Sequence, residues 1–240
     1  MKEIICEAGV AWYSLKEAKE LIKLASEVNC DAVKFQLYDK EIIKQVHPRW
    51  QKHLLKVMIT PKMAWELKEE ADLREIELFF TPMKDYFVPL CEELGVSRYK
   101  VRAKDGANDK ILLAIRLTEK PCYVSRINRD HFDPIKQKNF FSVYYDKWRP
   151  TKYIQLMSGY SNLLKADGYS CHQPKLLGVM QTMMMPGIDY VEVHCSLDVR
   201  DKTLPDQAYS YPFTDVLELV RWRDILNKAS PRVSRPKFEL

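Results

Sequence analysis

The sequence predicts a closed barrel of eight parallel strands surrounded by helices, the (β/α)8 or TIM barrel. Eight short apolar runs follow one another along the chain, and amphipathic segments with helical spacing lie between several of them. The chain has 240 residues, of which 46% are apolar, so it can bury the core of one such domain. A doubly wound sheet fits the alternation nearly as well, and composition does not separate the two folds.

The predicted strands are short apolar runs that would be covered on both faces. They lie at residues 3–9, 32–37, 77–83, 98–104, 122–127, 153–157, 168–172 and 190–197. In a parallel barrel, the active site lies where the strands meet the loops that follow them. Polar residues near the ends of these runs are therefore the candidates for function.

Amphipathic helices are predicted at residues 14–28, 60–73 and 212–226. The first opens with Ser14 three residues before Glu17, which is the spacing of a capping box. The second begins with Thr60 as N-cap and Pro61 in the first helical position, and Thr214 is expected to cap the third.

Two connections look short for a complete barrel. Only ten residues separate the predicted strands that end at 157 and begin at 168, and the segment 128–152 lacks helical periodicity. We therefore expect one or two outer helices to be shortened or missing, which leaves core surface for a neighbouring subunit to cover. No interdomain linker is visible, so residues 1–228 form one predicted domain and 229–240 a basic extension.

The composition limits the cellular setting and the partners. The net charge of +5 arises from 38 basic and 33 acidic residues spread over the whole chain, so no basic stripe predicts a nucleic-acid partner. Six cysteines without a CxxC pair indicate free thiols in a reducing cytosol. No stretch approaches the roughly 20 apolar residues of a membrane span, so a soluble cytoplasmic protein is expected.

Two of the five histidines lie where predicted strands give way to loops, in GYSCH and YVEVHC. If these strands are neighbours in a barrel, His172 and His194 lie at the same mouth and can converge on one divalent metal. Glu192 shares the face of His194 and can act as a ligand or as an acceptor behind the ligands. The alternative is that each histidine caps its strand through hydrogen bonds to backbone.

Lys34 and Lys100 interrupt runs that are otherwise apolar, where an unpaired ammonium is costly. Each requires an anion, which can be internal, as Glu7 would be for Lys34, or a ligand. Taken with His172 and His194, these residues predict a polar site at the mouth of the barrel.

Five motifs in series resemble the sialic acid synthase family, from about residue 3 to residue 228. They are CEAGVAWYSLKEAKELIKLASEVNCDAVKFQ, LFFTPMKDYFVPLCEELGVSRYKVRAKDGAND, IQLMSGYS, GYSCH and DYVEVHCSLDVRDKTLPDQAYS. Members of that family are barrels that condense phosphoenolpyruvate with the open-chain aldehyde of an N-acylated hexosamine, which gives a nonulosonic acid and phosphate. The resemblance implies the same reaction here, with a divalent metal, Mn²⁺ or Mg²⁺.

The resemblance also implies roles for individual residues. His172 and His194 would be the metal ligands, Lys34 and Lys100 would hold phosphoenolpyruvate, and Glu7 would lie near the reacting carbons. The implied substrate-binding residues are Ser170 on the phosphate, Gln36 in KFQ, Tyr160 after the sixth strand, Asp206 facing the sugar hydroxyls, and Asp105 at an acidic position of the family.

The chain also departs from the family pattern. Ala11, Trp12 and Tyr13 replace asparagine, histidine and glycine, so a polar contact is lost. Ala103 and Lys104 replace a serine and a glycine after the fourth strand, which removes a hydroxyl and adds positive charge.

Typical members continue into an antifreeze-like domain whose arginine reaches the sugar across a dimer, whereas this sequence ends at Leu240. Two hypotheses follow. The first is a metal-dependent synthase that uses phosphoenolpyruvate and a small sugar, as a homodimer or with a separate partner chain. The second is a non-catalytic or partner-dependent barrel that retains part of the anion and metal site.

Overall fold

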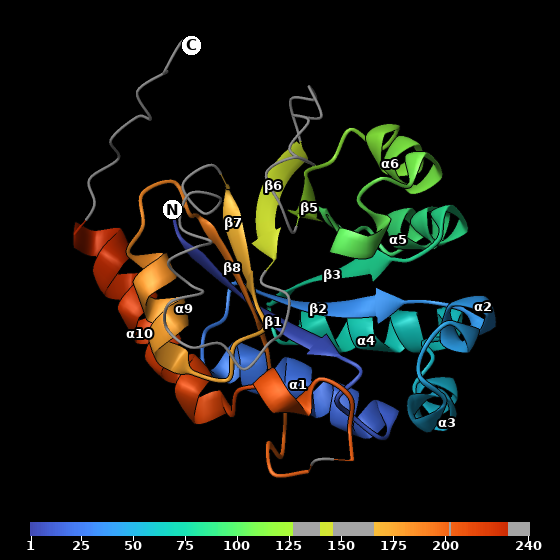
Figure 1. The fold of residues 1–240 in the computed structure, drawn as a ribbon, viewed down its shortest axis with the longest axis horizontal. Coiled ribbons are helices and arrows are strands. Elements are labelled where there is room, and N and C mark those ends of the chain that lie inside the picture. The colour runs from blue at the N-terminus through green and yellow to red at the C-terminus, as the bar shows by residue number, and fades with distance from the viewer. Residues whose placement is uncertain (127–139, 146–165, 202, 230–240) are drawn as a thin grey trace.

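The computed structural model describes residues 1–126, 140–145, 166–201 and 203–229 (Figure 1). Eight strands form a closed barrel in the order of the chain, and every neighbouring pair is parallel. They are β1 Glu3–Gly9, β2 Ala32–Leu37, β3 Glu77–Pro82, β4 Tyr99–Val101, β5 Cys122–Arg126, β6 Phe140–Tyr145, β7 Gly168–Cys171 and β8 Tyr190–His194. The predicted barrel is confirmed, and the doubly wound alternative is excluded.

Helices surround the strands (Figure 1). They are α1 Leu15–Glu27, α2 Lys40–Lys44, α3 Pro48–Lys56, α4 Pro61–Leu73, α5 Val88–Glu93, α6 Asp109–Arg116, α9 Leu176–Met183 and α10 Phe213–Ala229, with 3-10 turns at Asp85–Phe87, Ala103–Asp105 and Gln207–Tyr209. Most of the two connections predicted to lack helices, 128–152 and 158–167, and nearly all of the proposed extension 229–240 lie outside the described residues.

Side-chain caps fix two of the predicted helix starts. The Ser14 hydroxyl accepts a hydrogen bond from the Glu17 N–H at 3.3 Å, and the Thr60 hydroxyl accepts one from the Met63 N–H at 3.2 Å. The predicted cap at Thr214 was wrong, because α10 begins at Phe213 and Thr214 lies inside its first turn.

The sixth strand is not where the sequence predicted it. The prediction was 153–157, which lies outside the described residues, whereas β6 is Phe140–Tyr145 and pairs with β5 and β7. The string FFSVYY is rich in aromatic and β-branched residues, which favour strands. Residues 128–152 lack helical periodicity, and this property does not distinguish a connection from such a strand.

The strand ends place the candidate residues. His194 is the last residue of β8, and His172 directly follows β7. The fourth strand is shorter than predicted, because a 3-10 turn at Ala103–Asp105 follows Val101 closely. Both histidines therefore lie at the carboxyl ends of the strands, where barrel enzymes carry their active sites.

The opposite end of the barrel is closed by a buried arginine. Arg98 donates to Glu3 and to Glu77, both at 2.6 Å, and its guanidinium lies 5.0 Å from the centre of the Phe79 ring. Carboxylates on two strands thus balance a charge that would otherwise be costly to bury. This arrangement stabilises the fold at the end away from the candidate site.

Gly168, the first residue of β7, is paired in register with Tyr190 on β8. A Cβ built there would come within 2.7 Å of the Tyr190 carbonyl oxygen, and backbone cannot yield as a flexible side chain does. We expect Gly168→Ala to lower the free energy of unfolding by about 1–3 kcal/mol, measured in urea. Gly95→Ala is the control, because nothing lies within 4 Å of a Cβ there and only the strain of its φ of +69° applies, about 1 kcal/mol. Equal, small losses for both would contradict the crowding at Gly168.

No helix in the described ranges is both long enough and apolar enough to cross a membrane. All six cysteines fall within those ranges, and each is buried and free.

Candidate active site

The register of the strands brings the polar residues of the barrel mouth into one layer. Glu7 on β1 is paired in register with Lys34 on β2 and with His194 on β8. Ser170 on β7 is paired with Glu192 on β8. Side chains alternate along a strand, so Glu192 and His194 point to the same face. Five residues from four strands therefore converge inside the barrel.

Glu192 is the centre of a buried network, with 3% of its surface exposed. One carboxylate oxygen accepts hydrogen bonds from the Lys100 ammonium at 3.2 Å and from the Ser170 hydroxyl at 2.9 Å. The other accepts from the Tyr190 hydroxyl at 2.5 Å and lies 3.8 Å from the Lys34 ammonium. A carboxylate held in this way stays ionised and fixes both lysines.

A second ion pair lies beside the first. Lys34 forms a direct ion pair with Glu7 and donates to the Thr81 hydroxyl at 2.9 Å. The other oxygen of Glu7 accepts from the Gln36 amide at 2.9 Å. The internal pairing considered for Lys34 is therefore present in the structure, and Lys34 bridges the two carboxylates.

The surroundings shift the pKa values of these groups in different directions. Burial acts to raise the pKa of Glu192, but Lys100 and Lys34 outweigh it and hold that pKa below its usual range. Burial, and then the Glu192 charge, raise the pKa of Glu7 in spite of Lys34. Burial lowers the pKa of Lys100, whereas Glu192 and Glu7 outweigh burial at Lys34 and raise its pKa. Glu7 is thus the carboxyl better suited to carry a proton.

The two histidines face each other across the mouth. Their ring centres are 5.0 Å apart, and the ring of Tyr209 lies 4.9 Å from each. The Nδ1 of His172 is 3.2 Å from the Ser170 carbonyl oxygen, which orients the ring. Burial, and then the neighbouring His172, lower the pKa of His194 well below its usual range, so this imidazole is neutral at pH 7.

The loop after β8 brings Asp206 to the histidines. Its Oδ2 lies 4.0 Å from the Nδ1 of His194, and its other oxygen accepts a hydrogen bond from the Tyr209 hydroxyl. Asp206 has a φ of +67°, a left-handed conformation that is strained for a residue with a side chain. Gly9 lies beside Asp206 and leaves space among the polar groups. A Cβ at this position would lie 3.3 Å from Glu7 Oε1 and 3.5 Å from His194 Nδ1, so a side chain here would fill that space.

These side chains line a cavity of about 400 Å³, which we call the catalytic cavity. Its rim carries two further cations, Arg102 and Lys104, on the turn after β4. Lys104 donates to Gln45 at 3.1 Å, and Arg102 is paired with Asp105. Lys104, which was expected to add positive charge next to Ala103, therefore lies at the cavity.

Nine of the sequence-predicted residues line this cavity together. They are Glu7, Lys34, Gln36, Lys100, Ser170, His172, Glu192, His194 and Asp206. Asp105 is not among its lining residues, because its carboxylate turns to Arg102 instead. Tyr160, the remaining candidate, lies outside the described residues.

The sequence reasoning missed Thr81 and Tyr190. Thr81 is the polar residue in the run LFFTP and anchors Lys34, and Tyr190 precedes Glu192 by two positions and therefore shares its face. The spacing of two residues along β8 is a signal that could have found Tyr190. Trp12, one of the departures, is a core residue here, 1% exposed, that donates to the Gly9 carbonyl at 3.1 Å.

The donor set at the mouth fits a divalent metal. His172 and His194 offer two imidazoles, and Asp206 adds a carboxylate close to His194. Imidazole and carboxylate together suit Mn²⁺ and related ions. In the described ranges, no group of three or more His, Cys, Asp or Glu residues is already arranged as a metal site. Binding would therefore need Asp206, water or a substrate oxygen to complete the coordination.

A parallel barrel with a charged, buried site at the carboxyl ends of its strands is the arrangement of a barrel enzyme. Residues 21–127 match the NeuB family, which confirms the resemblance to the sialic acid synthases. In fold, the chain is similar to an N-acetylneuraminic acid (sialic acid) synthetase from Leptospira borgpetersenii, with a TM-score of 0.83 and 21% identity over 99% of this chain and 88% of that one.

Two further proteins are similar along most of the chain. A putative spore coat polysaccharide biosynthesis protein E from Chromobacterium violaceum has a TM-score of 0.77 at 16% identity, over 99% of this chain and 79% of that one. An uncharacterized protein from Methanocaldococcus jannaschii is 25% identical over 232 residues, which cover 90% of this chain and 68% of that protein. These similarities support the barrel fold, and they leave the substrate open.

Proposed function

We propose that this protein is a synthase that condenses phosphoenolpyruvate with an aldose of the N-acylhexosamine type, which gives a nonulosonic acid and inorganic phosphate. The observation that carries the proposal is the buried Lys34–Glu7 and Lys100–Glu192 pairs beside two facing histidines at the barrel mouth. Lysines fixed in this way are suited to hold a small polyanion.

The charge of the catalytic cavity favours an anionic ligand. Its four cations are Lys34, Lys100, Arg102 and Lys104, and its three carboxylates are Glu7, Glu192 and Asp206. Because the pKa of Glu7 is raised, this carboxylate can take up a proton, which would make the net charge of the cavity more positive. Lys100, Ser170 and the two rim cations would hold the carboxylate and phosphate of phosphoenolpyruvate, and Lys34 would fix Glu7.

The reaction would proceed by addition followed by elimination. The nucleophilic C3 of phosphoenolpyruvate attacks the aldehyde carbon and forms a C–C bond, which leaves a cation at C2. Water adds to C2 and loses a proton, for which Glu7 is the candidate acceptor. The bond between C2 and the bridging oxygen then breaks, so phosphate leaves with that electron pair, the C2 hydroxyl loses its proton, and C2 becomes a carbonyl. The aldehyde oxygen, which received the electron pair of its C=O bond during the attack, takes up a proton and becomes a hydroxyl. Gln36 and Asp206 would bind the sugar hydroxyls at the edge of the cavity.

His172 and His194 would hold a divalent metal, Mn²⁺ or Mg²⁺, which when bound polarises the aldehyde and stabilises the oxyanion formed by the attack. We expect calorimetry to show Mn²⁺ binding to the metal-free protein, and at least 100-fold weaker binding to the His172→Ala, His194→Ala double variant. His47→Ala, on an exposed histidine, is the control. If the double variant bound Mn²⁺ as tightly as the wild type does, His172 and His194 would not be the metal ligands.

The function is tested by phosphate release. Purified protein with phosphoenolpyruvate, Mn²⁺ and N-acetylated hexosamines should release inorganic phosphate only when metal and sugar are both present. Release without sugar would indicate a phosphatase, and no release with any aldose would favour the second hypothesis, a barrel that binds ligands without catalysis. The replacement of the family's serine by Ala103 is the observation that keeps this second hypothesis open.

The proposal includes a domain from residue 1 to 228, followed by an extension, in a protein of the cytoplasm. Six buried free thiols support a reducing compartment. A homodimer or a separate partner chain would supply any sugar contact that the barrel lacks. No nucleic acid or membrane is part of the proposed function.

A further inference from the structure

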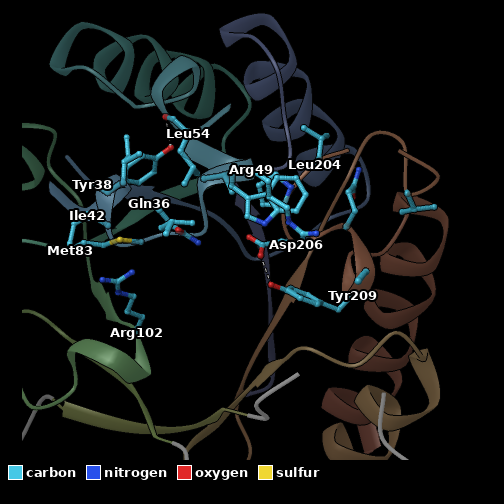
Figure 2. Close-up of a pocket in the computed structure, with 18 residues that line it drawn as sticks. Gln36, Tyr38, Ile42, Arg49, Leu54, Met83, Arg102, Leu204, Asp206 and Tyr209 are labelled. Carbon is cyan, nitrogen blue, oxygen red and sulfur yellow. Dashed lines mark hydrogen bonds between the residues drawn. The ribbon is translucent and has the colours of Figure 1, made fainter. Parts of the chain in front are cut away.

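A second cavity, of about 700 Å³, adjoins the catalytic cavity (Figure 2). We call it the apolar chamber. Its walls come from the residue after β1, from α2, α3 and the segments around them, and from the loop after β8, and they include Val10, Ile42, Val46, Trp50, Leu54 and Leu204. Figure 2 shows Leu54, Arg49 and Leu204 on one side of it, with Arg102 and Tyr209 on the other.

The chamber and the catalytic cavity lie next to each other and share part of their walls. Gln36, Met83, Arg102, Asp206 and Tyr209 line both of them. A molecule whose reactive end lies in the catalytic cavity can therefore extend past these residues into the chamber. Phosphoenolpyruvate is too small and too highly charged to be that molecule, since it has no apolar portion beyond its methylene.

The polar groups of the chamber wall are mostly engaged within the protein. The Tyr38 hydroxyl donates to the Leu54 carbonyl at 3.1 Å, and the Gln207 amide donates to the Asp198 carbonyl at 2.7 Å. Most other wall side chains are aliphatic or aromatic. Gln207 Oε1 accepts no hydrogen bond from the described residues, and Arg49 also lines the wall, so a hydroxyl group would find a partner at these two places. Elsewhere a tail rich in hydroxyl groups would lose its hydration, whereas an apolar tail would gain from burial.

We infer that the aldehyde substrate is an aldose with an apolar substituent larger than acetyl, and that the apolar chamber binds this substituent. The inference rests on the proposed function, because it takes the occupant to be the second substrate of the same reaction. Gln36 and Asp206 would contact the hydroxyls of the aldose at the boundary, and Ile42, Trp50, Leu54 and Leu204 would contact its substituent. The chamber volume is ample for several carbons beyond an acetyl group.

The test compares N-acetyl, N-butanoyl and N-hexanoyl forms of mannosamine and glucosamine as acceptors. Each added methylene that leaves water is expected to raise kcat/KM about two- to fourfold, so the hexanoyl form should exceed the acetyl form at least tenfold. In Trp50→Ala and in Val46→Asn, which alter half-buried wall residues, this ratio should fall to about three or less. Trp65→Ala, on the exposed face of α4, should keep the ratio of the wild type.

Calorimetric titration with the same six sugars separates this inference from the proposed function. Phosphate release without any preference for acyl length would overturn the chamber assignment and leave the synthase intact. Tighter binding of the hexanoyl sugars without phosphate release would support the chamber and overturn the synthase. If hexan-1-ol binds the chamber as tightly as the hexanoyl sugars do, the site is not a sugar site and the inference fails.

Discussion

Glu192→Gln is expected to lower the free energy of unfolding by about 3–5 kcal/mol, because it leaves two buried ammonium groups without their shared carboxylate. Glutamine keeps the shape of the side chain, so the loss reports charge and hydrogen bonding rather than a cavity. The amide also cannot accept at both oxygen positions from Ser170 and Tyr190. Urea unfolding followed by circular dichroism measures the change.

The matched control is Glu41→Gln, which removes a carboxylate from an ion pair with Lys84 at 2.9 Å, where the glutamate is 72% exposed. Solvent screens that pair, so its loss should cost at most about 1 kcal/mol. If Glu192→Gln is no more damaging than Glu41→Gln, the network around Glu192 does not hold the site together.

Lys100→Met is expected to weaken phosphoenolpyruvate binding by about 100-fold or more while leaving the protein folded. Methionine preserves most of the volume and removes the charge that would face the ligand. Lys34 stays 3.8 Å from Glu192 and still balances its charge, so the variant is expected to lose stability but to remain folded. Titration calorimetry with phosphoenolpyruvate gives the affinity, and thermal unfolding confirms that the variant is native.

Lys84→Met serves as the control, since Lys84 pairs with Glu41 and does not line the catalytic cavity. It should bind phosphoenolpyruvate as the wild type does. An unchanged affinity in Lys100→Met would show that the anion is held elsewhere, and the rim residues Arg102 and Lys104 would be the next to replace.

The strands around the site were predictable because their chemistry is unusual. Lysine within AVKFQ and histidine after GYSC stand out against apolar runs, and the parallel barrel requires that their strand ends meet. The register then explains the layer that contains Glu7, Lys34 and His194. The order of the strands and the alternation of their side chains are therefore enough to place these residues at one end of the barrel.

Other features depend on packing that periodicity does not show. The sixth strand was misplaced because FFSVYY has no helical pattern and lies in a segment assigned to a connection. Asp105 was expected at the ligand, but a turn directly after β4 lets its carboxylate pair with Arg102 three positions earlier. The apolar chamber is formed by Val10 after β1, by residues of α3 and by the loop after β8, which are far apart in the sequence.

The proposed synthase joins phosphoenolpyruvate to an aldose and breaks the bond between C2 and the bridging oxygen. The most direct test uses phosphoenolpyruvate labelled with ¹⁸O at that oxygen, incubated with the protein, Mn²⁺ and the N-acylhexosamines, followed by mass spectrometry of the phosphate and the product. We predict that the label stays in the phosphate and that a product with three more carbons than the sugar forms in equal amount. Unlabelled phosphate, or phosphate without the new product, would contradict the account.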